Sequence, residues 1–239
     1  MASHGNILHE RPLILAIENS GPCGSVALGS PNGCLAEYSL TSQKTHSKRL
    51  LATIDQLFRE TEQTIFGIDA IAISIGPGSF TGLRIGLATV KGLCMAAAKP
   101  LIGVSTLDAL AMQLPYQPRQ VCAALDARKK EIFAACYKTD HHGLPRQTMA
   151  PAALSPEALA GLITEETVFI GDGIQLYGVL LAKKLGPLFK EVSPTLFFPR
   201  AGAIAAVALH LYAEGEFLDP LTAAPLYVRA SDAEIQFGG

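Results

Sequence analysis

The sequence predicts an α/β protein built from two lobes around a cleft. In each half of the chain, short apolar segments typical of strands precede segments with helical periodicity. Each half also contains a strand that runs through a glycine turn into a helix, at 69–98 and again at 167–185. The polar segment 113–120 separates the halves, so we expect one lobe over 12–112 and a second over 113–239.

Composition narrows the class of protein. The chain has 239 residues, of which 49% are hydrophobic and 17% charged, with a net charge of −2. A freestanding nucleic-acid binder usually carries a basic excess, so the charge argues against that class and leaves RNA recognition through a partner open. The five cysteines form no CxxC pair, which favours buried thiols in a reducing cytosol. The polar start of the chain predicts no signal peptide, and the apolar run 92–98 is too short to cross a bilayer, so we expect a cytoplasmic protein.

The first half predicts strands and helices in the order β-β-β-α-β-α-β. Residues 45–60 have helical period, because Leu50, Ile54 and Leu57 fall on one stripe. The second helix follows a glycine-rich loop and ends near Ala98, just before Pro100. The expected strands are 13–18, 23–30, 33–40, 69–75 and 101–105, with a hairpin turn at Pro31-Asn32-Gly33.

The second half repeats this plan without a visible sequence repeat. Paired strands are expected at 121–127 and 131–138, with a weaker strand after the polar loop 139–147. The strongest helix is expected at 200–215, between Pro199 and Gly215, and the sequence leaves open whether it packs back on the first lobe. The remaining expected elements are a strand at 167–173, a helix at 174–185 and a late strand at 225–229.

The segment GPGSFTGLRIG, residues 76–86, is the most informative part of the sequence. It joins an apolar strand to an apolar helix, and Gly82 and Gly86 lie inside that helix. Each interior glycine costs a helix about 1 kcal/mol relative to alanine, so another interaction must offset the cost. Two interpretations are open. A second backbone approaches the helix closely, or the loop wraps around a phosphate or another chain.

Several segments, taken in order, resemble the bacterial TsaB family, also called YeaZ. The resemblance is strong over 13–137, thin afterwards, and returns at PLYVR. It implies the actin/hexokinase-like (ribonuclease H-like) fold, in which each lobe is a mixed sheet with β-β-β-α-β-α order. The matching segments are ILAIENSGPCGSVAL, THSKRLLATIDQLF, DAIAISIGPGSFTGLRIGLATVKGLCMAAAKPLIGVSTLDALA, LDARKKEIF and PLYVR.

The resemblance also implies a function. TsaB proteins are non-catalytic partners of the catalytic protein TsaD, and with the ATPase TsaE they transfer threonylcarbamoyl from threonylcarbamoyl-adenylate to an adenosine beside the anticodon of tRNA. It implies pairing with TsaD, self-pairing without TsaD, and only indirect contact with tRNA. The alternatives are a stand-alone ATP-dependent kinase or ATPase of the same fold, a zinc glycoprotease-like hydrolase, and a scaffold for some other partner.

No catalytic or metal-binding residue is expected. TsaD-type relatives hold a metal with an HxxxH pair near 100–115, where this chain has STLDALAMQLP and no histidine. Ser79 and Thr81 lack a neighbouring base in the sequence, and Ser79 fits better as a helix cap.

The family uses the helices 45–60 and 80–96 for pairing, and the resemblance carries that role to this chain. Gly82, Gly86, Thr89, Leu93 and Ala96 follow one face of the second helix, and the small side chains among them would let another helix approach closely. Internal packing competes as an explanation for Gly86 and Gly92. We expect Gly82→Leu to weaken TsaD binding and leave the fold intact. The expected partner contacts are His46, Arg49, Thr53, Phe80, Gly82, Arg84, Gly86 and Thr89.

A weak nucleotide site is the second candidate. Glu18 ends the first strand where relatives with this fold often have a metal-holding aspartate, and its longer side chain suits Mg²⁺ poorly. The competing interpretation is an acid that faces solvent. Arg128 could bind a phosphate or pair with Glu131. We expect no tightly bound cofactor, and ATP or ADP only at the interface of the complex. The candidate contacts are Glu18, Asn19, Ser20, Asp126, Arg128, Gly171 and Gly173.

Overall fold

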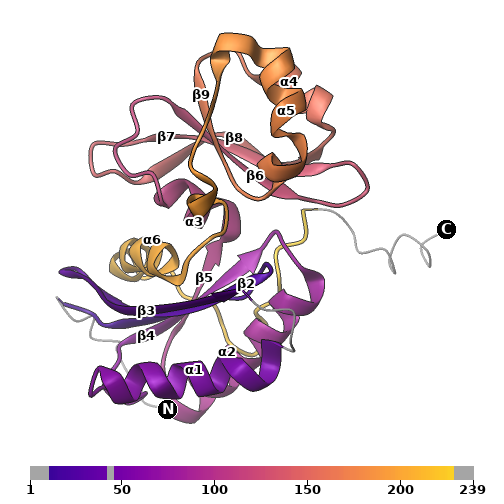
Figure 1. Cartoon of the computed structure of the whole chain (residues 1–239). Coiled ribbons are helices and arrows are strands. Elements are labelled where there is room, and N and C mark those ends of the chain that lie inside the picture. The colour runs from indigo at the N-terminus through magenta and orange to yellow at the C-terminus, as the bar shows by residue number, and fades with distance from the viewer. Residues whose placement is uncertain (1–10, 42–45, 229–239) are drawn as a thin grey trace.

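The computed structural model describes residues 11–41 and 46–228, and it omits the side chains of 46–49. Two sheets of five strands stand one above the other (Figure 1). The first sheet has the order β3-β2-β1-β4-β5, and helices α1 (His46–Glu60) and α2 (Phe80–Ala97) cover its outer face. Its strands are β1 (Ile14–Glu18), β2 (Cys23–Ser30), β3 (Gly33–Thr41), β4 (Ala70–Gly76) and β5 (Leu101–Ser105).

The second sheet has the same topology as the first. Its order is β10-β9-β6-β7-β8, and α4 (Pro156–Leu162) and α5 (Gly173–Leu185) cover one face. In each sheet three antiparallel strands come first in the chain, and two strands parallel to the first of them follow. The strands are β6 (Gln120–Asp126), β7 (Ile132–Thr139), β8 (Pro145–Leu154), β9 (Thr167–Ile170) and β10 (Phe189–Glu191). The predicted two-lobe, actin/hexokinase-like α/β fold is confirmed.

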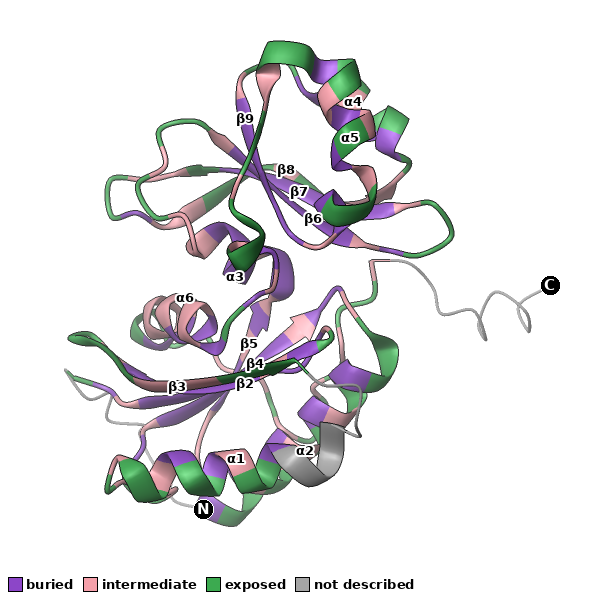
Figure 2. Cartoon of the chain, in the orientation of Figure 1, coloured by how far each residue is buried: buried purple, intermediate pink, exposed green. Residues whose placement is uncertain are grey.

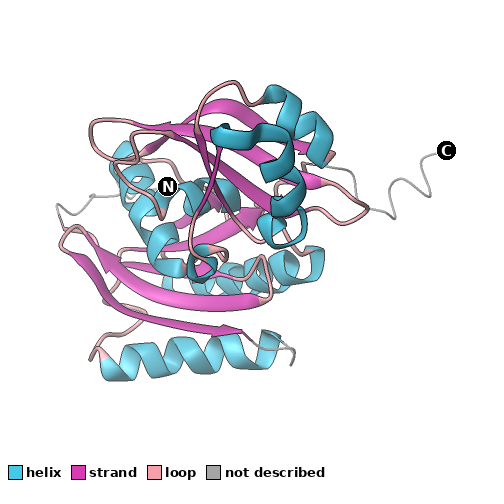
Figure 3. Cartoon of the chain, turned by 45° about the horizontal axis from the view of Figure 1, so that its top comes forward, coloured by secondary structure: helices cyan, strands magenta, loops and turns pink. Residues whose placement is uncertain are grey.

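Two helices pack on the inner faces of the sheets and lie between them in Figure 1. Figure 3 shows the same helices and strands with the top of the molecule turned forward. α3 (Thr106–Met112) follows β5 and packs on the inner face of the second sheet, where Leu107 and Leu110 join its core. α6 (Ala201–Glu214) follows the second sheet in the chain but packs on the inner face of the first, through Ile204 and Ala208. Each helix therefore follows the strands of one lobe in the chain and packs on the sheet of the other, and these two crossings connect the lobes.

Successive side chains of a strand point to opposite faces of the sheet, so the first sheet has two different buried faces. Leu15 and Ile17 of β1 point to α1 and α2, whereas Ile14 and Ala16 point to α6. Small residues dominate the α6 side, and a Cβ on Gly29 would lie only 2.5 Å from the Cβ of Ala205. The alanine-rich composition thus allows α6 to approach the sheet closely.

The structure differs from the sequence prediction at a few short elements. α3, α4, β10 and two single-turn 3₁₀ helices at Gly186–Leu188 and Pro194–Leu196 were not expected. The late strand predicted at 225–229 is wrong for 225–228, which are irregular, and 229 lies outside the described residues. One hydrogen bond, from the Leu226 amide to the Ile75 carbonyl at 2.7 Å, holds this segment beside β4.

Candidate partner face and inter-lobe cavity

The glycine-rich loop packs on the turn that follows β1. Ser79 caps α2, because its hydroxyl oxygen accepts a hydrogen bond from the Gly82 amide at 3.3 Å. The Ser79 amide donates to the Ser20 carbonyl at 2.6 Å, and the Asn19 side-chain amide donates to the Gly82 carbonyl at 2.7 Å. These bonds fix the start of α2 against the end of β1.

Gly82 and Gly86 are required by this close approach. A Cβ on Gly82 would lie 2.2 Å from the backbone oxygen of Asn19, and one on Gly86 would lie 3.0 Å from Cδ1 of Ile73. Both glycines are buried. The interpretation that a second backbone approaches the helix is confirmed. Asn19 of the same lobe covers both glycines, so their burial argues against the predicted role of Gly82 and Gly86 as partner contacts.

A different row of small residues faces outward from α2. Ala88, Gly92 and Ala96 are spaced four apart and exposed, with Met95 beside them at 64% exposure. Figure 2 shows α2 with buried and exposed segments along its length. We call Ala88, Gly92, Met95 and Ala96 the α2 ridge. A Cβ on Gly92 would meet no atom within 4 Å, so internal packing does not explain that glycine. The predicted row is therefore split, with Gly82 and Gly86 inside, Thr89 and Leu93 half-buried, and Ala96 outside.

α1 lies beside α2 and adds to the same outer face. Leu51 is 52% exposed, and Thr53 is half-buried and makes contacts of its own. His46 and Arg49 begin α1, but their side chains lie outside the described part. Among the described helices, α2 alone is long and apolar enough to cross a membrane, with 33% of it buried. Its packing on β4 and α1 identifies it instead as a core helix of the first lobe.

Phe80 and Arg84 connect the start of α2 to the C-terminal segment 218–228. The Arg84 guanidinium lies 3.7 Å from the centre of the Phe80 ring, and its Nε donates to the Tyr227 hydroxyl at 3.2 Å. The rings of Phe80 and Tyr227 stack at 5.8 Å. Thr89 donates its hydroxyl to the Ile85 carbonyl at 2.9 Å within the helix. Phe80 and Arg84 are both exposed despite these contacts, so they present atoms to solvent at the start of α2.

A cavity of about 660 Å³ opens between the lobes. Its aromatic wall consists of Phe80, Phe133, Phe198 and Tyr227, and it also contains the polar residues Ser20, Asp126, Arg128 and Asp172.

Only part of the predicted nucleotide site is assembled around this cavity. Ser20, Asp126 and Arg128 line it, whereas Asn19 is used under α2. Gly171 and Gly173 pack on β6, because their Cβ atoms would lie 2.1 and 3.0 Å from the Ala124 carbonyl oxygen. These two glycines therefore serve the strand-to-helix turn.

The charged side chains of the cavity have partners within the protein. Arg128 forms an ion pair with Asp126 at 3.0 Å. Asp172 accepts a hydrogen bond from the Asp126 amide at 3.0 Å, and burial raises the pKa of Asp172. Within the described residues, no three His, Cys, Asp or Glu side chains are grouped to hold a metal ion.

Comparison with known proteins identifies the family. The family model for TsaD, tRNA N6-adenosine threonylcarbamoyltransferase, matches residues 35–237. The Escherichia coli K12 protein named tRNA threonylcarbamoyladenosine biosynthesis protein TsaB is 32% identical over 90% of this chain and 94% of its own length. A Bacillus subtilis protein of the same name is 26% identical over 94% of this chain and 97% of its own. The chain belongs to the TsaB family.

Solved structures agree with this assignment. YeaZ from Pseudomonas aeruginosa superposes with a TM-score of 0.78 at 30% identity, covering 90% of this chain and 99% of that one. A second Pseudomonas aeruginosa structure, described as an uncharacterized protein with similarity to peptidase YEAZ, gives 0.79 at 30% identity, with 91% and 100% covered. The resemblance to TsaB seen in the sequence motifs is confirmed.

Glu18 of this TsaB-family chain is a buried carboxyl, so the interpretation that it faces solvent is wrong. Its Oε1 accepts hydrogen bonds from the amide and the hydroxyl of Ser20, both at 2.5 Å, while Oε2 has no partner among the described residues. Burial raises the pKa of Glu18 to about 7, and the hydrogen bonds from Ser20 partly oppose the rise. The carboxyl is therefore largely protonated below neutral pH.

This raised pKa predicts that the first lobe loses stability as pH rises. Glu18 has an ordinary pKa of 4.5 and a folded pKa of about 7, so the folded state binds the extra proton between these values. The free energy of unfolding should fall across that window by about 3 kcal/mol from this group alone. Glu18→Gln should remove this part of the fall, measured as the difference between urea midpoints at about pH 5 and about pH 8. An unchanged pH slope in Glu18→Gln would contradict the assignment.

Proposed function

We propose that this chain is the non-catalytic partner subunit of the TsaD–TsaB–TsaE machinery, which transfers threonylcarbamoyl to the adenosine next to the anticodon of tRNA. The names of its relatives place them in tRNA threonylcarbamoyladenosine biosynthesis. One observation carries the partner role. The outer face of α1 and α2 presents a row of small, apolar, exposed side chains that nothing in the described chain covers.

The chemistry of this face suits a helical partner. Small residues at 88, 92 and 96 let a second helix approach the α2 backbone closely, and Met95 and Leu51 supply adaptable apolar contacts at the edges. A contiguous apolar patch marks an interaction surface more often than it marks free surface. Two such faces would meet as a four-helix contact, with TsaD as the partner, or with a second copy of this chain when TsaD is absent.

The inter-lobe cavity supports a non-catalytic role. Asp126 pairs with Arg128, and Asp172 accepts a hydrogen bond from the Asp126 amide, so each carboxylate already has a partner within the protein. Glu18 lies below the cavity surface with its carboxyl turned to Ser20. These contacts weigh against the rival stand-alone kinase or ATPase. A protein of this machinery works in the cytoplasm, and ATP or ADP is expected only at the interface of the complex.

Reconstitution tests the proposal. TsaD, TsaE, threonylcarbamoyl-adenylate and tRNA should give modified tRNA only when this chain is added, and this chain alone should give none. The same samples should be assayed for Mg²⁺-dependent ATP hydrolysis by this chain alone, with Asp126→Ala as the control variant. Saturable turnover by the isolated chain, lost in Asp126→Ala, would overturn the proposal in favour of an independent ATPase. Full tRNA modification without this chain would also overturn it.

A further inference from the structure

The inter-lobe cavity has an aromatic wall that the partner role does not use. Phe80 and Tyr227 stack on each other along one side, and Phe133 and Phe198 belong to the second lobe and the segment before α6. Phe80 is 40% exposed and Tyr227 38%. Exposed aromatic rings at the mouth of a cavity are the surfaces on which unpaired nucleobases stack.

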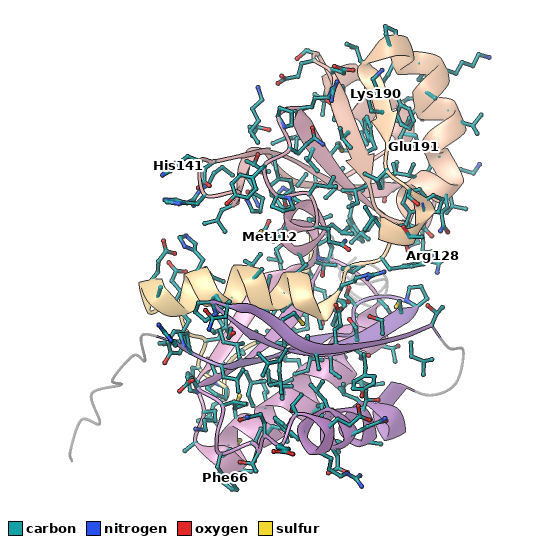
Figure 4. All side chains as sticks on the ribbon, turned by 60° about the vertical axis from the view of Figure 1, so that its left-hand side comes forward. Phe66, Met112, Arg128, His141, Lys190 and Glu191 are labelled. Atoms are coloured by element: carbon teal, nitrogen blue, oxygen red, sulfur yellow. The ribbon has the colours of Figure 1, made fainter. Side chains whose placement is uncertain are left out.

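A basic hairpin tip lies at the mouth of the same cavity. Arg128, Lys129 and Lys130 connect β6 to β7 and are all exposed, and Arg128 lines the cavity from the second lobe, where it is labelled in Figure 4. The Arg128 side chain is 85% exposed, whereas that of its ion-pair partner Asp126 is only 11% exposed. Because a guanidinium has five N–H donors, Arg128 can bind a phosphate with the donors that Asp126 does not use.

The backbone of this hairpin tip has a left-handed conformation that is energetically unfavourable for arginine and lysine. Arg128, Lys129 and Lys130 have φ angles of 60°, 51° and 64°, which is left-handed backbone at three consecutive residues. Glycine or asparagine would carry this conformation at lower cost. The local turn geometry alone therefore does not account for arginine and lysine at these positions, and Arg128 and Lys130 present positive charge on exposed side chains there.

Two further cations extend the basic rim. Arg84 lies over the Phe80 ring, which lines the cavity, and Arg200 directly follows Pro199, which also lines it. We call Arg84, Arg128, Lys129, Lys130 and Arg200 the basic rim. Arg128 lines the cavity, and the other four cations lie close to a lining residue in the chain or in contact with one, so phosphates on either side of a base in the cavity would meet positive charge.

We propose that the inter-lobe cavity takes an unpaired nucleotide of an RNA loop, with the base against Phe80 and Tyr227 and the flanking phosphates on Arg128 and Lys130. The proposal deepens the proposed function, because it gives the partner subunit a direct contact with RNA. It replaces the expectation from net charge and family resemblance that RNA is met only through a partner.

The cavity favours an RNA loop over a free nucleoside triphosphate. Asp126 and Asp172 lie inside the cavity, where they repel a polyphosphate but can accept hydrogen bonds from exocyclic amines of a base. The cations lie at the rim, where an RNA backbone continues in both directions. Gly171 and Gly173, which were candidate contacts for a nucleotide, are packed on Ala124.

The test uses the full chain and a short RNA stem–loop whose loop carries 2-aminopurine. Stacking on the aromatic wall should quench the 2-aminopurine fluorescence and report binding. The double variant Arg128→Gln/Lys130→Gln should raise the RNA Kd about tenfold and lower the salt slope of log K by about 1.4, or about 0.7 for each lost phosphate contact. Lys183→Gln/Lys184→Gln, at the end of α5, removes the same charge and should leave both values unchanged.

Each outcome has a defined meaning. Loss of affinity in the rim variant with retained affinity in the α5 variant supports the proposal. Equal loss in both variants, or no quenching with the unmodified chain, overturns it. Complete displacement of the stem–loop by AMP, with the same dependence on Arg128, would show a site for a free mononucleotide and also overturn it. TsaD binding measured on the same variants should be unchanged, so failure of RNA binding is distinguishable from failure of the partner role.

Discussion

Replacing Gly82 with leucine is expected to unfold the first lobe, not only to weaken partner binding. The Cβ alone would lie 2.2 Å from the Asn19 carbonyl oxygen, which is backbone held by the end of β1. Neither element can give way without breaking the hydrogen bond from the Asn19 side chain to the Gly82 carbonyl at 2.7 Å. Overpacking of this kind costs about 3 kcal/mol or more. The same loss should appear in Gly82→Ala, measured by urea unfolding followed by circular dichroism.

Gly92→Ala is the matched control for this prediction. Gly92 lies in the same helix, but a Cβ there would meet no atom within 4 Å. The substitution should raise the free energy of unfolding by about 1 kcal/mol through helix propensity alone. If Gly82→Leu folded with unchanged stability, the described packing of α2 on the end of β1 would be wrong.

The fold could be predicted from the sequence where the local signals were strong. The strands around 13–18 and 69–75 are short, almost fully buried apolar runs, and the helix at 200–215 is bounded by Pro199 and Gly215. α3 and α4 are seven residues each, too short for a period to show. The residues 225–228 have an apolar sequence but pair with β4 through a single backbone bond, so they do not form a strand.

The candidate site was less predictable, because α2 is apolar on all sides. Leu83, Leu87 and Val90 are buried, while Ile85 and Met95 lie on the other side, so the pattern does not select a face. The face of α2 that is buried depends on its contact with Asn19, which is 63 residues away from Gly82 in the chain. The row of small residues at 88, 92 and 96 was visible in the sequence as a four-residue spacing, and it would have identified the α2 ridge.

Placing a carboxylate on the α2 ridge is expected to abolish pairing with TsaD. In Ala88→Glu the new charge lies on the α2 ridge, near the middle of the helix, where docking of an apolar helix would bury it without a partner. We expect the Kd for TsaD to rise at least about a hundredfold. The monomer should keep its stability, because Ala88 is exposed. Titration calorimetry with TsaD, together with thermal unfolding of the variant, measures both effects.

Val179→Glu is the matched control for Ala88→Glu. Val179 lies on α5, which holds in the second lobe the position that α2 holds in the first, and it is 88% exposed. The same apolar-to-acidic change there should leave TsaD binding unchanged. Equal loss of binding in the two variants would show that charge at any exposed helix disturbs the complex, and the ridge would not be the docking surface.

Hydrogen–deuterium exchange of this chain with and without TsaD tests the central claim most directly. The account predicts that TsaD slows amide exchange in α2 over residues 88–96 and in the adjoining part of α1, with α4 and α5 unchanged. Protection confined to α4 and α5, or no protection in α2 at a TsaD concentration that saturates binding, would contradict it.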